Sequence, residues 1–494
     1  MPTAVDEAAA PQQPDARRTV AVLVAVNAVR FAFAPFFDLV PQEAYYFLYS
    51  QHLALSYFDH PPVLAWILRL FTDVFGAHEL SVRLSAFATS CLTQWLWVDL
   101  ARRYLGPRWT HAALIWLTSG AVTVTSLIST PDVPLLLFWT LSVHQLYAAL
   151  FAGKRWAWIW AGVAMGLAFD SKYTGIMLQG GLVLFLVLSP LHRRLLRTPW
   201  PWTTLALAQL VMAPVYIWNA QHRFASFLFQ TAERAQTASG FGVQWLAGLL
   251  GSQAALVGIP LLIALFVVTL RSVRTWRAAA TEEGNRRLFL VCFFLPTFAL
   301  FFGISLFALV KPNWLLPAYM TGTLLAAEWM TPRWRKVQLL LAAVLHVLAA
   351  VELVFYPVRI QSDDTWVGWR RLAAEVQQRA AEHPGAFIAS ADGYKTAAEL
   401  RFYTALEVYG PNVIGQRGLQ FDYTDPDLSR LVGRSALFID SAPRDFSSEP
   451  GPGVPAPVAE RFGECAEVQP ILIEEGGRIV RKFRVYSCQS YRGP

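Results

Sequence analysis

The sequence predicts a polytopic α-helical membrane protein that ends in a small α/β domain, and three observations predict this class. Of its 494 residues, 55% are apolar and only 15% are charged, whereas soluble proteins carry roughly 25% charged residues. Apolar runs of the length that crosses a bilayer, about 17–25 residues, recur along residues 19–356. From residue 357 onward the long apolar runs stop, and Asp, Glu, Gly and Pro return.

Basic residues fall in short clusters at the ends of the apolar runs, which is the pattern that orients a membrane protein. Arg17 and Arg18 precede the first run, so the N-terminus is expected in the cytoplasm, and each later basic cluster then falls on that same side. The net charge of +7 is therefore a topological signal, and no nucleic-acid partner is expected. About eleven spans are predicted, near residues 19–37, 80–103, 109–128, 134–152, 156–170, 174–190, 203–218, 244–270 and 288–309, in a tenth run that ends before Arg333, and near 338–356.

The chain is predicted to have three parts. Residues 1–18 are expected to be a disordered cytoplasmic N-terminus, residues 19–356 the transmembrane domain, and residues 357–494 a soluble domain on the outer side. Within the transmembrane domain, the first outer loop (38–79) is expected to carry two helices, 43–55 and 61–75, that lie in the membrane interface. The second has an apolar stripe too short to cross about 30 Å of hydrocarbon, formed by Leu64, Ile67, Leu68, Phe71 and Phe75.

The tail from residue 357 reads as a single α/β or α+β core. Residues 365–382 show helical periodicity, with Trp366, Trp369, Leu372, Val376 and Ala380 on one face. A second helix is predicted near 397–403, and strands at 386–390, 436–439 and 479–486. Cys465 and Cys488 both fall in this domain, where an oxidising compartment would permit a disulfide; two unpaired buried thiols are the alternative. Cys91 and Cys292 fall in spans and are predicted to be packing residues.

Polar side chains gather in the loops on the outer side. The segment 38–62 holds Asp38, Glu43, His52, Asp59 and His60 between two apolar runs. A charged side chain costs roughly 2.5–3.5 kcal/mol at the bilayer centre, so a cluster of them beside a span commonly marks a working site. The plain alternative is that loops between spans are always more polar than the spans.

Four later outer positions add further polar groups, at Asp132, Lys172-Tyr173, His222 and Lys311. Lysines could hold an anionic lipid phosphate, and a carboxylate could deprotonate an acceptor group. Each position also has an ordinary explanation, since a lysine at the end of a span anchors the helix by snorkelling and a Thr-Pro-Asp turn caps a helix. The joint placement of these residues at one membrane face favours the catalytic interpretation.

The outer loops resemble those of bacterial family 39 glycosyltransferases. These GT-C class proteins are related to protein O-mannosyltransferases, to the aminoarabinose transferases of lipid A and to the galacturonic acid transferases of rhizobia. The similar motifs occur in the order of the family over roughly residues 20–330. They are Glu43-Ala44-Tyr45-Tyr46, Tyr57-Phe58-Asp59-His60-Pro61-Pro62, Thr130-Pro131-Asp132, Ser171-Lys172-Tyr173-Thr174, Trp218-Asn219-Ala220-Gln221-His222 and Lys311-Pro312-Asn313-Trp314.

The resemblance implies a GT-C fold in the bacterial inner membrane with a periplasmic C-terminal domain. It implies that a sugar moves, with inversion, from a polyprenyl-phosphate donor to a lipid, glycan or protein acceptor at the periplasmic face. No nucleotide is needed, no cofactor and no metal-ligand set are predicted, and a need for a divalent cation is not decided. By the same resemblance, His60, Lys172, Tyr173 and Lys311 face the donor phosphate or its sugar, and Gln42, Tyr46, Asp59 and His222 support the acceptor or the loop.

One departure from the family pattern concerns the catalytic acid. The family usually has Asp-Glu where this chain has Gln42-Glu43, and a glutamine cannot accept a proton at neutral pH. Glu43 and Asp132 are therefore predicted to share the catalytic work, and Gln42→Asp is expected to raise activity. Asp38 folding back into the site is an alternative. A catalytically impaired homologue that binds lipid-linked sugar and a lipid or sugar transporter are the rival functions, although the chain shows no convincing internal repeat.

Overall fold

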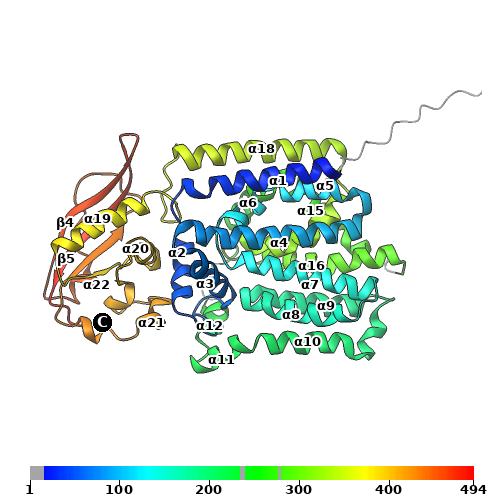
Figure 1. Ribbon diagram of the computed structural model, residues 1–494, viewed down its shortest axis with the longest axis horizontal. Helices are drawn as coiled ribbons and strands as arrows, with labels where there is room; N and C mark the ends of the chain where they lie inside the picture. Colours follow the sequence, from blue (N-terminus) through cyan, green and yellow to red (C-terminus); the bar gives the residue numbers. More distant parts are fainter. Residues whose placement is uncertain (1–15, 234–239, 276–279) are drawn as a thin grey trace, which may run out of the picture.

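The computed structural model describes residues 16–233, 240–275 and 280–494 and consists of a helical bundle followed by a C-terminal sheet domain (Figure 1). The two parts lie end to end, and the short helices α2 and α3 lie where the bundle meets the sheet domain. Residues 1–15 of the predicted disordered N-terminus are outside the described residues. The remaining residues of that segment, 16–18, already belong to the first helix.

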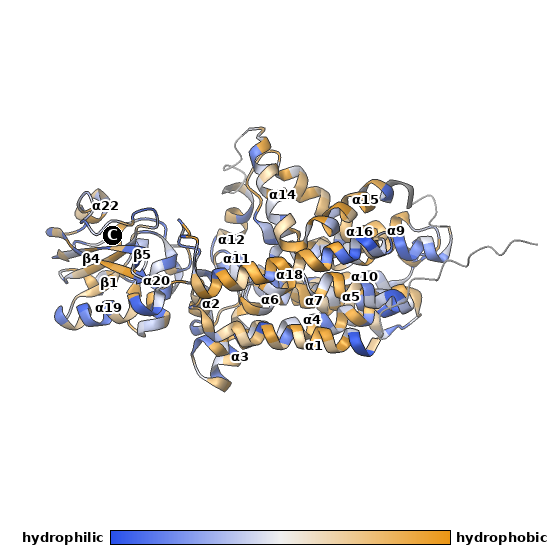
Figure 2. Cartoon of the chain, turned by 90° about the horizontal axis from the view of Figure 1, so that it is seen from above, coloured by the Kyte–Doolittle hydropathy of each residue, from blue (hydrophilic) through white to orange (hydrophobic). Residues whose placement is uncertain are grey.

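The bundle is built from long and broken helices. They are α1 (Ala16–Phe33), α4 (Glu79–Leu105), α5 (Trp109–Leu117), α6 (Gly120–Leu127), α7 (Asp132–Phe151), α8 (Trp156–Ser171), α9 (Met177–Leu188), α10 (Pro199–Val211), α11 (Ala213–Gln221), α14 (Val243–Val257), α15 (Ile259–Thr275), α16 (Glu282–Ile304), α17 (Leu316–Ala327) and α18 (Pro332–Phe355). Among the described helices, four are long and apolar enough to cross a membrane unbroken: 16–36, 132–151, 282–304 and 332–355. Figure 2 shows hydrophobic residues along the outer surfaces of this bundle.

Three spans that were predicted as continuous are interrupted in the structure. The predicted span 109–128 is divided into α5 and α6, and 203–218 into α10 and α11. The predicted span 244–270 is divided into α14 and α15, which are bent by 115°. At that bend Gly258 has a φ of 86°, in the left-handed region. Gln338 of α18 accepts from the Leu261 N–H at 3.1 Å and donates to the Val257 carbonyl at 2.7 Å. A neighbouring helix thus satisfies the backbone groups that the break leaves open, which is what a break inside a membrane requires.

The first outer loop carries two short helices, α2 (Pro41–Gln51) and α3 (Val63–Phe75). On α3 the predicted stripe is divided, because Leu64 and Leu68 are buried against protein whereas Phe75 is exposed. Most side chains of α2 are buried against protein, and the interfacial placement of the segment 43–55 stays a prediction. Tyr45 and Tyr49 belong to one hydrophobic cluster with core residues of the C-terminal domain, so this loop and that domain share a core.

The C-terminal domain is a mixed five-stranded sheet in the order β2-β1-β3-β5-β4. Strand β1 (Phe387–Ala389) is parallel to β2 (Val408–Tyr409) and β3 (Ala436–Ser441), while β5 (Arg478–Gln489) is antiparallel to β3 and β4 (Glu464–Glu475). The domain also contains helices α19 (Trp369–Glu382), α20 (Tyr394–Thr404), α21 (Phe421–Thr424) and α22 (Ala456–Ala459). The predicted helices and the three predicted strands are confirmed within a few residues. The two edge strands, β2 and β4, were not predicted.

Cys465 and Cys488 form a disulfide between the paired strands β4 and β5, so the first of the two alternatives for these residues is confirmed. The other two cysteines have free thiols: Cys292 is buried and Cys91 is half-buried. Both lie in helices of the bundle, as predicted.

Candidate functional site

Three polar side chains from distant parts of the chain meet at the outer-loop end of the bundle. The Asp132 carboxylate accepts from Lys172 Nζ at 2.7 Å through one oxygen and from Asn313 Nδ2 at 2.5 Å through the other. Asp132 is 2% exposed and Lys172 is 7% exposed, so the ion pair is buried. A buried pair of this kind is costly to desolvate unless its remaining hydrogen-bonding capacity is used, and such groups inside membrane proteins mark functional sites.

Local sequence explains why these side chains point inward. Asp132 is the first residue of α7 and follows Pro131, so its negative charge lies at a helix N-terminus, where the helix dipole favours it. Lys172 ends α8 with extended backbone angles, φ −158° and ψ 137°, which turns the chain away from the helix axis. Gly175 then lies against α8, where an added Cβ would meet the Ala168 backbone at 2.4 Å. Only glycine permits this close return of the chain, which holds Lys172 beside α7.

Glu43 lies in a second buried cluster that is bound chiefly by backbone groups. One carboxylate oxygen accepts from the Ser129 N–H at 3.0 Å, the other accepts from the Val40 N–H at 3.2 Å, and Arg83 Nη2 lies 3.8 Å away. Burial raises the pKa of Glu43, against the lowering effect of Arg83 and of the two N–H groups. Arg83 itself donates to the carbonyls of Phe37 and Asp38 at 2.7 and 2.6 Å. Glu43 therefore ties α2 to the turn that precedes Asp132.

Gln42 and Asp38 face the C-terminal domain. Gln42 Nε2 donates to Asp364 Oδ1 at 2.7 Å, and that carboxylate also pairs with Lys395 at 2.9 Å. Asp38 pairs with Arg370 at 3.2 Å. The alternative in which Asp38 takes the place of the family aspartate is therefore not supported by its contacts in the structure.

The other predicted positions lie around these two clusters. Asp59 accepts from the hydroxyls of Tyr45, at 3.4 Å, and of Tyr49. The rings of Tyr46 and His60 meet edge to face at 5.6 Å. Each of these contacts stays within the first outer loop.

Tyr173, His222 and Lys311 lie on later outer segments. The Tyr173 hydroxyl and Ser226 Oγ are 2.5 Å apart, at the start of the short helix α12 (Ala225–Leu228). His222 stacks on Trp218 at 4.1 Å, and Lys311 is exposed.

The structure joins Asp132, predicted as an acid of the reaction, to Lys172, predicted as a donor-binding residue. The carboxylate of Glu43 binds Val40, Ser129 and Arg83 instead. Sequence reasoning missed Asn313, which provides the contact with Asp132 from the segment where Lys311 was predicted to act. It also missed Arg83 and Ser129, which bind Glu43. Asn313 lies inside a motif that had already been recognised, so its amide was a detectable signal.

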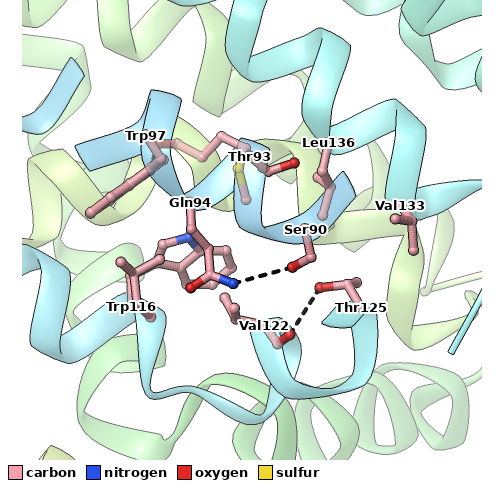
Figure 3. Close-up of a pocket in the computed structure, with 11 residues that line it drawn as sticks. Ser90, Thr93, Gln94, Trp97, Trp116, Val122, Thr125, Val133 and Leu136 are labelled. Carbon is pink, nitrogen blue, oxygen red and sulfur yellow. Dashed lines mark hydrogen bonds between the residues drawn. The ribbon is translucent and has the colours of Figure 1, made fainter. Parts of the chain in front are cut away.

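Two cavities in the described part of the molecule are lined by other residues than those of the Asp132 and Glu43 clusters. Figure 3 shows a cavity of about 20 Å³ inside the bundle, lined by Ser90, Thr93, Gln94, Trp97, Trp116, Leu117, Val122, Thr125, Val133, Leu136 and Met320. That volume suffices for one water molecule and is too small for a sugar. A recess of about 550 Å³ lies on the C-terminal domain between residues 361–363 and 442–445, and its lining includes none of the predicted site residues. Within the described residues, no three His, Cys, Asp or Glu side chains are grouped as metal ligands would be.

Comparison with known families matches a segment that contains part of this site. Residues 59–218 match the sequence profile of the dolichyl-phosphate-mannose-protein mannosyltransferase family. The chain is similar to that family over this segment. The GT-C resemblance inferred from the outer-loop motifs is therefore confirmed, and the matched segment includes Asp132 and Lys172.

Curated relatives of this GT-C family support the same conclusion. The lipid A galacturonosyltransferase RgtD of Rhizobium johnstonii is 27% identical over 305 residues, which are 60% of this chain and 62% of RgtD. The undecaprenyl phosphate-alpha-4-amino-4-deoxy-L-arabinose arabinosyl transferase of Pseudomonas aeruginosa (strain UCBPP-PA14) is 35% identical over 127 residues, 24% of this chain and 23% of that protein. In both cases the similar region spans less than two thirds of the relative.

Solved structures show how far the fold agrees. The crystal structure of ArnT from Cupriavidus metallidurans in the apo state matches with a TM-score of 0.65 at 16% identity, covering 95% of this chain and 98% of ArnT. The structure of the same ArnT bound to undecaprenyl phosphate matches with a TM-score of 0.61 at 17% identity and the same coverage. The chain therefore has an ArnT-like fold, a multi-pass helical membrane protein with a C-terminal mixed α/β domain, which confirms the predicted class.

Proposed function

We propose that the protein transfers a sugar from a polyprenyl-phosphate donor to a lipid, glycan or protein acceptor at the outer face of the bacterial inner membrane. The observation that carries this proposal is the buried cluster of Asp132, Lys172 and Asn313. Its members come from three outer segments that all lie in family-like motifs. The family match, the names of the relatives and the ArnT-like fold support the same chemistry.

The proposed reaction needs one base and one group that binds the leaving phosphate. The acceptor hydroxyl attacks the anomeric carbon of the donor sugar, a new carbon–oxygen bond forms, and the bond from that carbon to the phosphate oxygen breaks with inversion. Asp132 receives the hydroxyl proton. Lys172 has three N–H donors, of which Asp132 uses one, so the others are available to stabilise the departing polyprenyl phosphate.

In this proposal Glu43 is a positioning residue. Both of its oxygens are occupied by backbone N–H groups, and one of these belongs to Ser129, three residues before Asp132. Glu43 therefore holds the turn from which Asp132 projects, and the proton transfer falls to Asp132. This modifies the hypothesis that the two acids share the catalytic step.

We also propose that the N-terminus is cytoplasmic and that the first outer loop and the C-terminal domain are periplasmic. Leu53 in the first loop and Lys154 between α7 and α8 are both exposed, and they fall on opposite sides in this topology. Single cysteines at these positions, in a chain whose Cys91 and Cys292 are serine, should react with a membrane-impermeant maleimide in whole cells only at residue 53. Labelling at residue 154 without labelling at residue 53 would reverse the orientation.

The decisive test of activity uses purified protein, a labelled polyprenyl-phosphate sugar and a bacterial membrane extract. If labelled sugar appears on an acceptor from the extract and free polyprenyl phosphate is released, the protein is a transferase. Donor binding without transfer would identify an inactive homologue. Movement of the labelled donor across a reconstituted bilayer without transfer would identify a transporter.

A further inference from the structure

The three parallel strands of the C-terminal domain lie in the order β2-β1-β3. Helix α20 connects β1 to β2, and the segment 410–435 then returns past β1 to β3. The two connections cover opposite faces of the sheet. Ile388 belongs to a hydrophobic cluster with Ala398 of α20, whereas Phe387, the residue before it, belongs to another cluster with Leu431 of the returning segment. In sheets wound in this way the chain order reverses between β1 and β3, and ligands commonly bind outside the carboxyl ends of the strands at that switch point.

The recess of about 550 Å³ on this domain borders the switch point. Residues 442–445, which follow β3 directly, form one side of it, and residues 361–363 of the linker after α18 form the other. Ser441, the last residue of β3, donates through its N–H to Asp392, three residues after β1, at 2.6 Å, and its hydroxyl donates to Asp363 of the recess lining. The volume is within the range of small-molecule sites, roughly 300–1,000 Å³.

Both acids that line the recess are paired with buried cations. Asp363 pairs with Arg481 at 3.1 Å, and Asp445 pairs with Lys482 at 2.6 Å. Arg481 is 2% exposed and Lys482 is 0% exposed, so these cations bind the acids from inside the domain. The two pairs therefore add no net charge to the recess.

Arg444 gives the recess a positive charge. Its side chain is exposed and makes no hydrogen bond, ion pair or ring contact with the other described residues. A second exposed cation, Arg359, lies 5.2 Å from the ring centre of Phe446, two residues after Arg444. Gln361 adds an exposed amide to the same lining. A guanidinium binds a phosphate through two N–H groups, and an amide N–H can add a third hydrogen bond.

The recess lies near the point where the chain leaves the bundle. Helix α18 ends at Phe355, and Figure 1 shows this end where the bundle meets the sheet domain. Gln361 is six positions further on, so it lies within about 22 Å of the helix end. The linker also contacts the first outer loop, because Gln42 donates to Asp364 at 2.7 Å. Lipid headgroups and soluble molecules of the outer compartment can both reach this place.

We propose that this recess is a binding site for a phosphate ester, in which the phosphate binds Arg444 and the organic group lies between the linker and the segment after β3. The ester is either the headgroup of an anionic phospholipid or a soluble phosphate ester. The site shares no lining residue with the Asp132 cluster, so it stands whether or not the protein transfers a sugar.

Isothermal titration of the full-length chain in an uncharged detergent tests this site. The probes are glycerol 3-phosphate, dihexanoyl phosphatidylglycerol, and glycerol as the uncharged comparison. Arg444→Gln should weaken binding of a phosphate-bearing probe about tenfold or more. Arg444→Lys should recover part of the affinity, because it keeps the charge but loses the two-pronged geometry. The matched control is Arg492→Gln, which removes an exposed arginine at the other end of β3, where the Gly433 N–H donates to the Tyr491 carbonyl.

A second variant tests the recess itself. Ala442 lines the recess and is half-buried, so Ala442→Trp fills the space and leaves both arginines in place. Loss of phosphate binding at an unchanged melting temperature assigns the ester to the recess. Full binding by Ala442→Trp shows that Arg444 acts only as a surface charge, and overturns the site.

The probes distinguish the two sources of the phosphate. Binding of glycerol 3-phosphate that depends on Arg444 assigns the site to a soluble ester, and binding of dihexanoyl phosphatidylglycerol alone, with the same dependence, assigns it to a lipid headgroup. No binding of either by the wild type, or equal affinity of Arg444→Gln and the wild type for both, overturns the site. Binding that keeps its full affinity in Arg444→Gln and is lost in Lys172→Ala belongs to the Asp132 cluster and likewise overturns the recess.

Discussion

Glu43 with Arg83 and Asp132 with Lys172 are both buried acid–cation pairs at the outer-loop end of the bundle, but they are bound in different ways. The Glu43 oxygens accept from two backbone N–H groups, and Arg83 lies at 3.8 Å while its own donors bind carbonyls. Among the described residues, the Asp132 oxygens accept from two side chains, Lys172 at 2.7 Å and Asn313 at 2.5 Å. One pair holds backbone segments together, whereas the other consists of groups that can exchange partners.

This difference distinguishes an acid that holds backbone segments in place from the acid that we propose as the base. A carboxylate bound by backbone N–H groups cannot release them without moving the loops they belong to, so it is suited to hold a shape. A carboxylate bound by a lysine and an amide can pass those donors to a phosphate with only side-chain motion. Burial alone does not distinguish the two, since Glu43 is 0% exposed and Asp132 is 2% exposed.

The largest expected effect is that of Asp132→Asn on turnover. If Asp132 is the base, its loss should lower kcat about 10²–10⁴-fold, the usual contribution of general-base catalysis. Donor binding should change much less, because the asparagine keeps the shape of the site. Single-turnover kinetics with labelled donor measure the two separately. Full turnover by Asp132→Asn would remove Asp132 from the reaction.

Lys172→Ala should act on the donor. A hydrogen bond to a charged group contributes about 1.5–3 kcal/mol, so loss of the ammonium group proposed to bind the phosphate should lower the affinity for polyprenyl phosphate about tenfold or more. Lys154→Ala is the matched control, because this lysine is exposed at the opposite end of the α7–α8 pair. Equal donor affinity in both variants would reduce Lys172 to a snorkelling residue.

Glu43→Gln should reduce stability more than chemistry. A glutamine side chain has one acceptor oxygen for the two N–H groups of Val40 and Ser129, so one buried donor loses its partner, at a cost of about 1–3 kcal/mol. The melting temperature in detergent should fall, while the kcat of the folded fraction stays within about tenfold of the wild type. A loss of kcat as large as that of Asp132→Asn, at unchanged stability, would restore Glu43 as a catalytic acid.

A third pair, Asp392 and Asp440 in the C-terminal domain, extends the comparison because both of its members are acids. Burial and then the charge of Asp440 raise the pKa of Asp392 to about 7, and burial also raises the pKa of Asp440. The folded state therefore binds more protons than the unfolded state between about pH 4 and pH 7. Stability of the C-terminal domain should fall as the pH rises through this window and level off above it.

Thermal melts of the full-length chain between pH 4.5 and 8 measure this dependence. Asp392→Asn should flatten it. Asp445→Asn is the control, because the pKa of Asp445 is already lowered to about 2 by its bond to Lys482, and it should leave the slope intact. A slope that persists in Asp392→Asn would show that this acid pair does not titrate in that range.

The smallest effect is expected from Gln42→Asp. The family pattern suggested a gain in activity, but the Gln42 amide donates to Asp364 and does not contact the Asp132 cluster. An aspartate there would set two carboxylates against each other, with Lys395 partly compensating, so turnover should stay within a few-fold of the wild type. Gln42→Ala is the neutral comparison. A rise in kcat well above that range would place the base beside α2 after all.

Much of the molecule follows from local patterns. The apolar runs predicted the bundle, and the 3.6-residue spacing of Trp369, Leu372 and Val376 predicted α19, because hydrophobic burial acts on neighbouring positions of one helix face. The breaks at 118–119 and at Gly258 could not be predicted in this way. They depend on Ser119, which caps α6, and on Gln338, which lies 80 positions away from the bend it satisfies.

The sequence by itself determined the class of the protein, the approximate spans, most of the sheet, and the motifs that contain Asp132, Lys172 and Asn313. Only the tertiary structure decided which polar groups are partners. In the fold, Glu43 accepts from the Ser129 backbone N–H, Gln42 donates to Asp364, and the ring of Tyr423 in the C-terminal domain contacts the Trp218 ring. The physical reason is that composition and periodicity describe residues that are neighbours in the sequence. The role of a polar side chain depends on which donor or ring the fold brings within a few ångströms of it.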